Sequence, residues 1–449
     1  MHSEMVDQQL ALNKLTLQDN APVERPVSGS EYYHASIGSS GLTLERDRQI
    51  CFALEGTCAA DIPAQVWRDA IATTTQANPA LRMRWKGILG WSRWVNDGPP
   101  PSLRMLDHVD WSLNSSEHMD FLDAWPIDLR HGPVVEFIVA RRPDNRLLVV
   151  MRTHHAIMDG MGGFHVLCEL FRALRGEPLL GSNVTFSDAQ LVEALNPPKS
   201  PSLRVPTCRL IEHAEPGYSV NNSVSNSVSN SGSNSGSNSV SNSVTKSVNQ
   251  VDLLGDAWQR FSLGSGHSKA LSKVACAFAA LAHKSSTLPA LIAVPVDLRR
   301  HMPAMRSVTN FSSMLVVKLL PGDGPEVFQT RLRELLEAKV ELSVAKGFNL
   351  IRWFPMWLVD VLLGRTRKNF LSKRPMETVV ISNLGAVPLQ HFQGAGFEAD
   401  DFTCVPIPGN AFAVLMQING DFRVILGLPK AQLAQCQFDE IARFVNESL

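Results

Sequence analysis

The segment "VVMRTHHAIMDGMGGFHVLCELFRALRG", from Val149 to Gly176, contains the patterns of a strand, a turn and a helix in immediate succession. Apolar, often β-branched residues run up to His154, as in a buried strand. From Phe164 to Leu174 the apolar residues recur at helical spacing, and Gly176 is typical of a helix end. The preceding "VVEFIVA" and the turn residues "RRPDN" predict that the strand belongs to a β-hairpin.

The length and composition are those of an ordinary globular protein with two domains. The chain has 449 residues, too many for one compact core, and its net charge of -1 gives no overall attraction for nucleic acid. The N-terminus lacks the pattern of a signal peptide and the apolar stretches are short for a membrane span, so we expect a cytoplasmic protein. Seven scattered cysteines without a C-x-x-C pair favour neither a disulfide framework nor a zinc site.

A repeat rich in Ser and Asn divides the chain into two parts. From Ser219 to Gln250 it repeats Ser-Asn-Ser with Val or Gly, and such a segment cannot bury enough apolar surface to fold. Both parts mix strand patterns with amphipathic helices, which predicts an α/β (α+β) fold with mixed sheets. In the second part we expect Ser268 to cap a helix rather than act as a hydrolase nucleophile, and Asn419–Gly420 to turn a hairpin.

The two adjacent histidines of "HHAIMDG" cannot both face one cleft from a regular strand, because successive side chains point to opposite faces. A metal site needs converging ligands and is therefore disfavoured. A neutral imidazole accepts a proton from a hydroxyl or amine that attacks a carbonyl, so one histidine fits a general base. Asp159 fits the partner of an arginine, and Gly160 allows an unusual backbone conformation or the close passage of a substrate. Structural histidines at a strand end explain the residues equally well, and the residues alone leave both interpretations open.

The same string resembles the H-H-x-x-x-D-G signature of the superfamily that includes chloramphenicol acetyltransferase, nonribosomal peptide synthetase condensation domains, wax ester synthase and polyketide-associated acyltransferases. Four further segments resemble elements of this superfamily, in the same order along the chain. They are "NPALRMRW" (Asn78–Trp85), "PIDLRHGPVVEFIV" (Pro126–Val139), "VPVDLRRHMP" followed by "NFSSMLVVKL", and "VVISNLG". The "DFGWG" element of several relatives is missing, and "NGDFRVILGLP" stands roughly in its place, which argues against the plant-type branch.

The resemblance implies two similar lobes, each a mixed sheet flanked by helices, with an active-site tunnel at their interface. The expected divisions are an N-terminal extension (1–29), an N-terminal lobe with the motif (30–215), a Ser/Asn-rich linker (216–250) and a C-terminal lobe (251–449). By the family pattern His155 is the general base, His154 and Asp159 are structural, Arg299 pairs with Asp159, and Gly160 lies beside the tunnel. Further candidates to line the substrate tunnel are Met158, Gly162, Asn310, Ser382 and Asn383.

The activity that the resemblance implies is transfer of an acyl group from acyl-CoA or a phosphopantetheinyl carrier protein to an alcohol or amine. The expected setting is secondary-metabolite or lipid ester or amide biosynthesis, without a metal or a bound cofactor. No carrier or adenylation segment adjoins the motif, so we expect a free-standing enzyme. The alternative is a catalytically silent docking or scaffold protein of a biosynthetic assembly. The intact motif together with Arg299 favours the enzyme.

The stretch "IRWFPMWLVDVLLGRTRKNFLSKR" joins apolar residues to a basic cluster. The basic residues of this cluster are Arg365, Arg367, Lys368, Lys373 and Arg374. A core helix with a solvated end is the simpler interpretation. Two functional interpretations stay open: a tunnel wall with a basic patch for the phosphates of the donor, or contact with a membrane surface.

Overall fold

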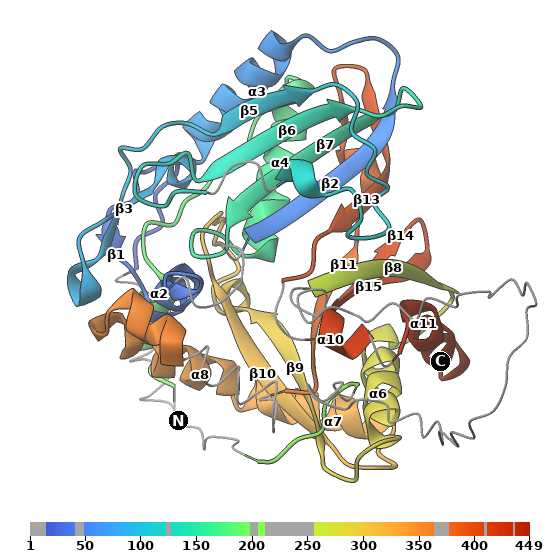
Figure 1. Ribbon diagram of the computed structural model, residues 1–449. Coiled ribbons are helices and arrows are strands. Elements are labelled where there is room, and N and C mark those ends of the chain that lie inside the picture. The colour runs from blue at the N-terminus through green and yellow to red at the C-terminus, as the bar shows by residue number, and fades with distance from the viewer. Residues whose placement is uncertain are drawn as a thin grey trace, which may run out of the picture.

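Two six-stranded sheets, drawn one above the other in Figure 1, and a small three-stranded sheet form the framework of the computed structural model. The structure describes residues 15–40, 49–122, 127–197, 205–211, 256–362, 377–407, 411–433 and 436–449. The expected linker (216–250) and the basic cluster (365–374) lie outside these ranges. Helices accompany both large sheets, so the predicted two-lobed α/β fold with mixed sheets is confirmed.

The sheet of the first lobe has the strand order β12-β13-β2-β7-β6-β5. These strands are β2 (Gln49–Cys58), β5 (Ser102–Leu106), β6 (Val135–Arg141), β7 (Leu147–His154), β12 (Gln393–Gly394) and β13 (Phe397–Cys404). Neighbours are antiparallel except β5 and β6, which are parallel. The predicted hairpin is the β6–β7 pair, and every residue of β7 is buried, which explains its continuous apolar run.

The first lobe also contains helices and a small sheet, and the histidine turn joins its strand β7 to one of these helices, α4. The α-helices are α2 (Gly29–Ser36), α3 (Ala64–Ala77), α4 (Gly160–Leu174) and α5 (Asp188–Leu195), and the short helices are η1 (Pro79–Arg82), η2 (Leu89–Trp91) and η3 (Asp120–Leu122). The small sheet consists of β1 (Arg25–Pro26), β3 (Arg84–Lys86) and β4 (Arg93–Val95). Helix α4 has the predicted position, and Gly176 beyond its end adopts a left-handed conformation with φ of 70°.

The sheet of the second lobe has the order β10-β9-β11-β14-β15-β8. These strands are β8 (Asp256–Ser265), β9 (Ala290–Asp297), β10 (Ser312–Leu319), β11 (Val379–Ala386), β14 (Phe412–Ile418) and β15 (Asp421–Pro429). Strand β11 is parallel to both of its neighbours, and the other pairs are antiparallel. The predicted hairpin joins β14 to β15 through Asn419 and Gly420, with φ of 51° and 85°, as Asn-Gly turns require.

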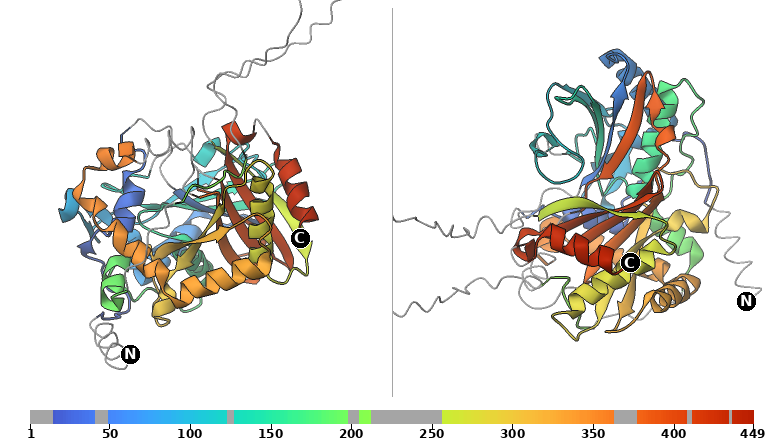
Figure 2. Two further views of the ribbon diagram at one scale, coloured as in Figure 1. Left: turned by 90° about the horizontal axis from the view of Figure 1, so that it is seen from below. Right: turned by 90° about the vertical axis from the view of Figure 1, so that its right-hand side faces the viewer.

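The helices of the second lobe cover one face of its sheet (Figure 2). They are α6 (Ala270–His283), α7 (Pro325–Glu337), α8 (Val340–Phe348), α10 (Lys430–Leu433) and α11 (Phe438–Glu447). The short helices in this part of the chain are η5 (Leu298–His301), η6 (Ile351–Trp353) and η7 (Leu389–His391); η6 contacts α2 and η2, and η7 contacts β13 and α4. Helix α6 contacts β9 and β11, α7 contacts β10, and α11 contacts β8 and α6. Ser268 does not cap α6 as expected. Instead Lys269 precedes the helix in a left-handed conformation, with φ of 60° and no capping side-chain bond.

Two expected domain boundaries differ from the structure. Strands β12 and β13 belong by sequence to the expected C-terminal lobe, but β13 pairs with β2 and completes the sheet of the first lobe. The expected extension of residues 1–29 is not separate over its described part, because Val23 and Val27 are buried and β1 pairs with β4. Pairing between distant segments decides both features, and the periodicity of the sequence does not reveal it.

Candidate active site

The turn between β7 and α4 gives the two histidines different partners. Nδ1 of His154, at the end of β7, accepts a hydrogen bond of 3.0 Å from the backbone N–H of Ala156. Nδ1 of His155 lies 3.1 Å from the carbonyl oxygen of Met158. A carbonyl oxygen only accepts, so this bond assigns the proton of the neutral ring to Nδ1 of His155 and the lone pair to Nε2, while Nδ2 of Asn310 lies farther from Nδ1, at 3.5 Å. This is the tautomer that a general base needs.

Two of the five tunnel candidates hold His155 in place. Asn310, fully buried in the second lobe, donates from Nδ2 to the carbonyl oxygen of His155 at 2.9 Å. Met158 has a fully buried side chain and contributes its carbonyl oxygen. The position of His155 therefore depends on its own turn and on one residue of the other lobe.

A third histidine, His34, lies against His155. The two imidazole rings are stacked, with centroids 3.8 Å apart and planes inclined by 17°. His34 belongs to the last turn of α2, in the part of the chain before the motif. No sequence pattern marks His34, since a single histidine in "SEYYHAS" matches no motif.

Helix α2 is held at its start by its own lobe and at Tyr32 by the second lobe. Ser28 and Glu31 form a capping box at its start, and Arg25 donates to both carboxylate oxygens of Glu31 at 2.9 and 2.6 Å. The hydroxyl of Tyr32 donates to the carbonyl oxygen of Phe354, in the second lobe, at 2.7 Å. These bonds keep the helix, and with it His34, at a defined place beside the histidine turn.

Asp188 is buried beside Ser30 and Glu31 of α2, and its carboxyl group should make the free energy of unfolding depend on pH. Its carboxylate accepts a 2.5 Å hydrogen bond from Ser30, and burial together with the charge of Glu31 raises the pKa of Asp188 to about 6. When the pKa of a carboxyl is higher in the native state, that state binds more protons than the unfolded state between about pH 4 and pH 6. The contribution of Asp188 to stability therefore falls as pH rises through this window.

We expect Asp188→Asn to remove this dependence. Between about pH 4 and pH 6 the free energy of unfolding of the variant should rise, relative to wild type, by roughly 3 kcal/mol. Urea denaturation of both proteins across this range measures the difference. Parallel stability curves for the two proteins would contradict the assignment.

Asp159 and Arg299 form an ion pair between the lobes. Two guanidinium nitrogens of Arg299 donate to the two carboxylate oxygens of Asp159, at 3.0 and 3.1 Å. Asp159 also accepts from the backbone N–H of Gly162 at 2.7 Å, as the N-cap of α4, and from that of Phe311 at 2.6 Å. Four hydrogen bonds thus saturate a carboxylate that is almost completely buried.

The guanidinium of Arg299 also has partners in its own lobe. It donates to Asp297 at 2.8 Å and to the carbonyl oxygens of Ser307 and Thr309 at 3.1 and 2.6 Å. Burial alone would lower the pKa of Arg299, but the charges of Asp159 and Asp297 outweigh burial and raise it. The pair therefore stays charged and ties the start of α4 to the second lobe.

Gly162 permits close contact between the lobes. A Cβ atom at Gly162 would lie 2.4 Å from the carbonyl oxygen of Val308, whereas one at Gly160 would meet only the side chain of Leu384, at 3.9 Å. Gly160 has no positive φ, so its expected unusual conformation is not observed. In the structure Gly162 faces the backbone of the other lobe.

This contrast makes Gly162→Ala a test with a matched control. We expect Gly162→Ala to lower the free energy of unfolding by about 1–3 kcal/mol, because the added methyl group must displace backbone. Gly160→Ala gains the same helix propensity in the same turn without the clash. Urea denaturation measures the free energy of unfolding of both variants, and equal values would count against the close contact at Gly162.

Among the described residues, no group of three or more His, Cys, Asp or Glu side chains is arranged to hold a metal ion. The described helices are also too short or too polar to cross a membrane.

Comparisons with known proteins agree with this architecture. No protein-family model matches the chain. A segment of 105 residues, 23% of the chain, is 30% identical to part of nonribosomal peptide synthetase 5 of Gibberella zeae, and the chain spans about 1% of that protein. The starter condensation domain of rhizomide synthetase RzmA matches with a TM-score of 0.57 at 12% identity, over 95% of this chain and 96% of that one.

Two further solved structures contain coenzyme A or a derivative. A mutant of the same RzmA domain in complex with C8-CoA has a TM-score of 0.56 at 14% identity, over 98% of this chain and 95% of that one. F. graminearum TRI101, complexed with coenzyme A and deoxynivalenol, has a TM-score of 0.55 at 13% identity, over 94% of this chain and 98% of that one. The chain has the condensation-domain fold. In this condensation-domain fold, the histidine turn lies where the two lobes meet (Figure 1).

The second lobe contains a cavity on the side of β11 that faces away from the histidine turn. Asn383 and Gly385 line a cavity of about 320 Å³, while Leu384 between them is the side chain nearest to Gly160. The rest of the lining comes from the start of α6, from α7, and from β14 and β15. Ser382, the last of the tunnel candidates, is half-buried in β11 beside Val414. Strand β11 therefore separates this cavity from the histidine turn.

Proposed function

We propose that the protein is an acyltransferase that moves an acyl group from a thioester to an alcohol or amine, with His155 as the general base. The observation that carries this proposal is the hydrogen bond between Nδ1 of His155 and the carbonyl oxygen of Met158. It leaves Nε2 as the atom that accepts a proton. The biosynthesis of secondary-metabolite or lipid esters and amides is the setting that fits this chemistry.

In the proposed reaction, the hydroxyl or amine of the acceptor attacks the thioester carbonyl while Nε2 of His155 takes its proton. The new C–O or C–N bond forms, the C–S bond then breaks, and the thiolate takes the proton back from the imidazolium. The base is regenerated, and neither an acyl-enzyme nor a redox step is needed. His154 and the Asp159–Arg299 pair hold the turn, because they bond to its backbone and to the second lobe.

One observation supports a thioester as the donor. Structures with this fold contain C8-CoA or coenzyme A. Either acyl-CoA or an acyl group on a phosphopantetheinyl carrier protein supplies the same thioester.

The experiment that tests the proposal is release of free thiol from acyl-CoA, with and without alcohol and amine acceptors. A transferase releases CoA at a rate that depends on the acceptor, and the acyl group appears on that acceptor. A silent docking protein releases none with any donor, and a hydrolase releases it equally without an acceptor. Either of these last two results would refute the proposal.

His34 gives the proposal a further prediction. We expect His34→Ala to lower kcat by about ten- to hundredfold with little change in KM, because the ring of His155 loses the neighbour that orients it. His34→Phe should stay within about threefold of wild type, since a phenyl ring can take the same stacked position. Steady-state kinetics on both variants, with melting temperatures as a check on folding, measure this. Equal kcat values for His34→Ala and wild type would contradict an orienting role.

A further inference from the structure

Helix α2 lies against the second lobe, where it contacts α8 and η6 (Figure 1). The backbone N–H of Gly29, at the start of α2, donates to Oδ1 of Asn349 at 3.1 Å. The hydroxyl of Tyr32 donates to the carbonyl oxygen of Phe354 at 2.7 Å. These two hydrogen bonds join the first turn of the helix to residues 349–354 of the other lobe.

A further contact with the second lobe follows the end of α2. The hydroxyl of Ser40 donates to Oδ2 of Asp360 at 2.5 Å, and its backbone N–H donates to the same oxygen at 2.9 Å. Asp360 is buried. His34 lies between Tyr32 and Ser40 in the sequence, so the second lobe holds the chain on both sides of His34.

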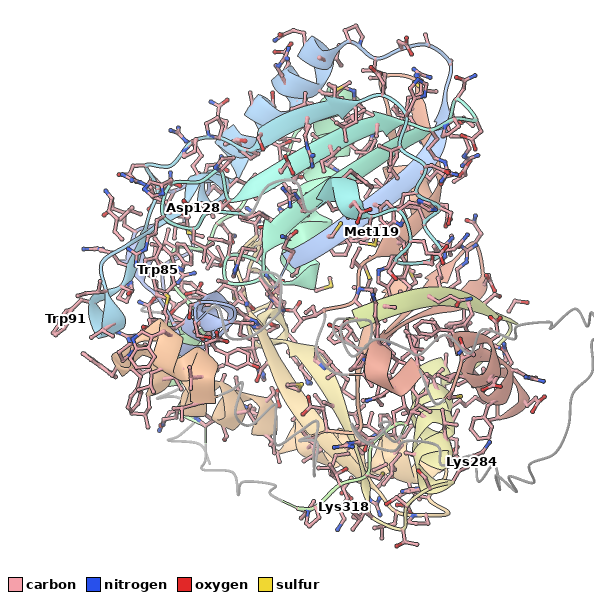
Figure 3. All side chains as sticks on the ribbon, in the orientation of Figure 1. Trp85, Trp91, Met119, Asp128, Lys284 and Lys318 are labelled. Atoms are coloured by element: carbon pink, nitrogen blue, oxygen red, sulfur yellow. The ribbon has the colours of Figure 1, made fainter. Side chains whose placement is uncertain are left out.

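Tyr32 is anchored in the first lobe as well as in the second. Its side chain is buried, and its ring packs against that of Trp85 (labelled in Figure 3), with centroids 5.6 Å apart. Burial raises the pKa of Tyr32 above its usual value, so the hydroxyl keeps its proton at neutral pH and donates to Phe354. Tyr32 therefore joins the two lobes two positions before His34 in the same helix.

The stack between His34 and His155 restrains a motion that the hydrogen bond to Met158 leaves open. That bond holds Nδ1 of His155, but the plane of the ring can still tilt about it. The ring of His34, 3.8 Å away and inclined by only 17°, opposes this tilt. A tilt displaces Nε2, the proposed proton acceptor, and a displacement of about 1 Å can lower a rate by about 10²-fold.

We propose that Tyr32 is a positioning residue for His155 and acts through helix α2 and the stacked ring of His34. This inference rests on the proposed function and adds to it a residue that acts at a distance from the base. The contact of the second lobe with α2 then determines the direction of Nε2. The base is therefore correctly oriented only when the two lobes are docked at Tyr32.

The kinetic test compares Tyr32→Phe, His34→Ala and the double variant of the full-length protein. Tyr32→Phe removes the hydroxyl and keeps the ring, and we expect kcat to fall by about three- to tenfold with little change in KM. In the His34→Ala background the same substitution should change kcat by less than about twofold, because its effect passes through His34.

Ser36→Ala is the matched control for Tyr32→Phe. It also removes a hydroxyl of a buried residue of α2, but the hydroxyl of Ser36 donates within the helix, to the carbonyl oxygen of Tyr33 at 2.8 Å. The kcat of Ser36→Ala should stay within about twofold of wild type. Melting temperatures show whether each variant is folded.

A spectroscopic measurement tests the positioning of the ring without acyl transfer. The ring current of His34 shifts the Hε1 resonance of His155 in ¹H–¹³C spectra of protein with labelled histidine. His155→Ala assigns this resonance, and His34→Ala gives its position without the stack. We expect Tyr32→Phe to move the resonance towards that position, and Ser36→Ala to leave it where it is in wild type.

The inference is overturned if Tyr32→Phe keeps the kcat of wild type, or if it lowers kcat equally with and without His34. It is also overturned if the resonance of His155 does not move in Tyr32→Phe. If wild type transfers no acyl group to any acceptor, the proposed function fails and the resonance alone decides. A shift in Tyr32→Phe would then still support the positioning of His155 by Tyr32, and no shift would overturn it.

Discussion

Arg299→Ala is expected to lower the free energy of unfolding by about 3–5 kcal/mol. The substitution leaves the carboxylate of Asp159 buried at the lobe interface without the cation that neutralises it. Asp159→Ala should have a similar effect, since it removes the N-cap of α4 and one of the two carboxylates that neutralise the guanidinium. Because the two residues interact directly, the double variant should lose less than the sum of the single losses. Urea denaturation of the three variants gives the values.

An exposed ion pair provides the control for this experiment. Lys269 and Glu326 are 2.8 Å apart but largely exposed, so Glu326→Ala should cost less than about 1 kcal/mol. If Arg299→Ala and Asp159→Ala were as stable as Glu326→Ala, the buried pair would not hold the lobes together.

His155→Ala is expected to lower kcat/KM for acyl transfer by about 10²- to 10⁴-fold, the usual contribution of a general base. We expect the variant to stay folded, with a loss of about 1–3 kcal/mol, because the hydrogen bond to Met158 and the stacking contact with His34 are lost. The measurement is acceptor-dependent release of thiol, on protein whose melting temperature is close to that of wild type.

His131→Ala serves as the matched control, because His131 is a highly exposed histidine of the same lobe. It should retain the kcat/KM of wild type. A His155→Ala variant as active as His131→Ala would show that another group takes the proton of the acceptor.

The local parts of the fold follow from the sequence because short-range physics determines them. The apolar run before His154 and the helical spacing after Gly163 predict the strand and helix around the turn; α4 ends at Leu174 as expected but begins earlier, at Gly160. The Asn419–Gly420 hairpin forms because both residues adopt left-handed conformations at little cost. Strand alternation also separates His154 from His155, as their different hydrogen-bond partners show.

Long-range features of the site do not follow from the sequence. His34 reaches His155 because Arg25 binds Glu31 of α2 and Tyr32 of the same helix bonds to Phe354 of the second lobe. The capping box marks the start of α2 in the sequence, but neither of these two contacts has a local signature. The entry of β13 into the first sheet depends on pairing with β2. At the start of α6, Ser268 is a residue type that commonly caps helices, but it does not form the cap. Lys269 precedes the helix instead, in a left-handed conformation that the propensities of lysine do not predict. Tertiary context decides each of these cases.

The most direct test of the proposed function is mass-spectrometric measurement of acylated acceptor formed from acyl-CoA by wild type and by His155→Ala in parallel. We predict that wild type forms the ester or amide in proportion to the acceptor supplied. The folded variant should form at least about a hundredfold less. Equal product from the two proteins, or no acylated acceptor from wild type with any acyl-CoA or acyl-carrier donor, would contradict the assignment of His155 as the base of an acyltransferase.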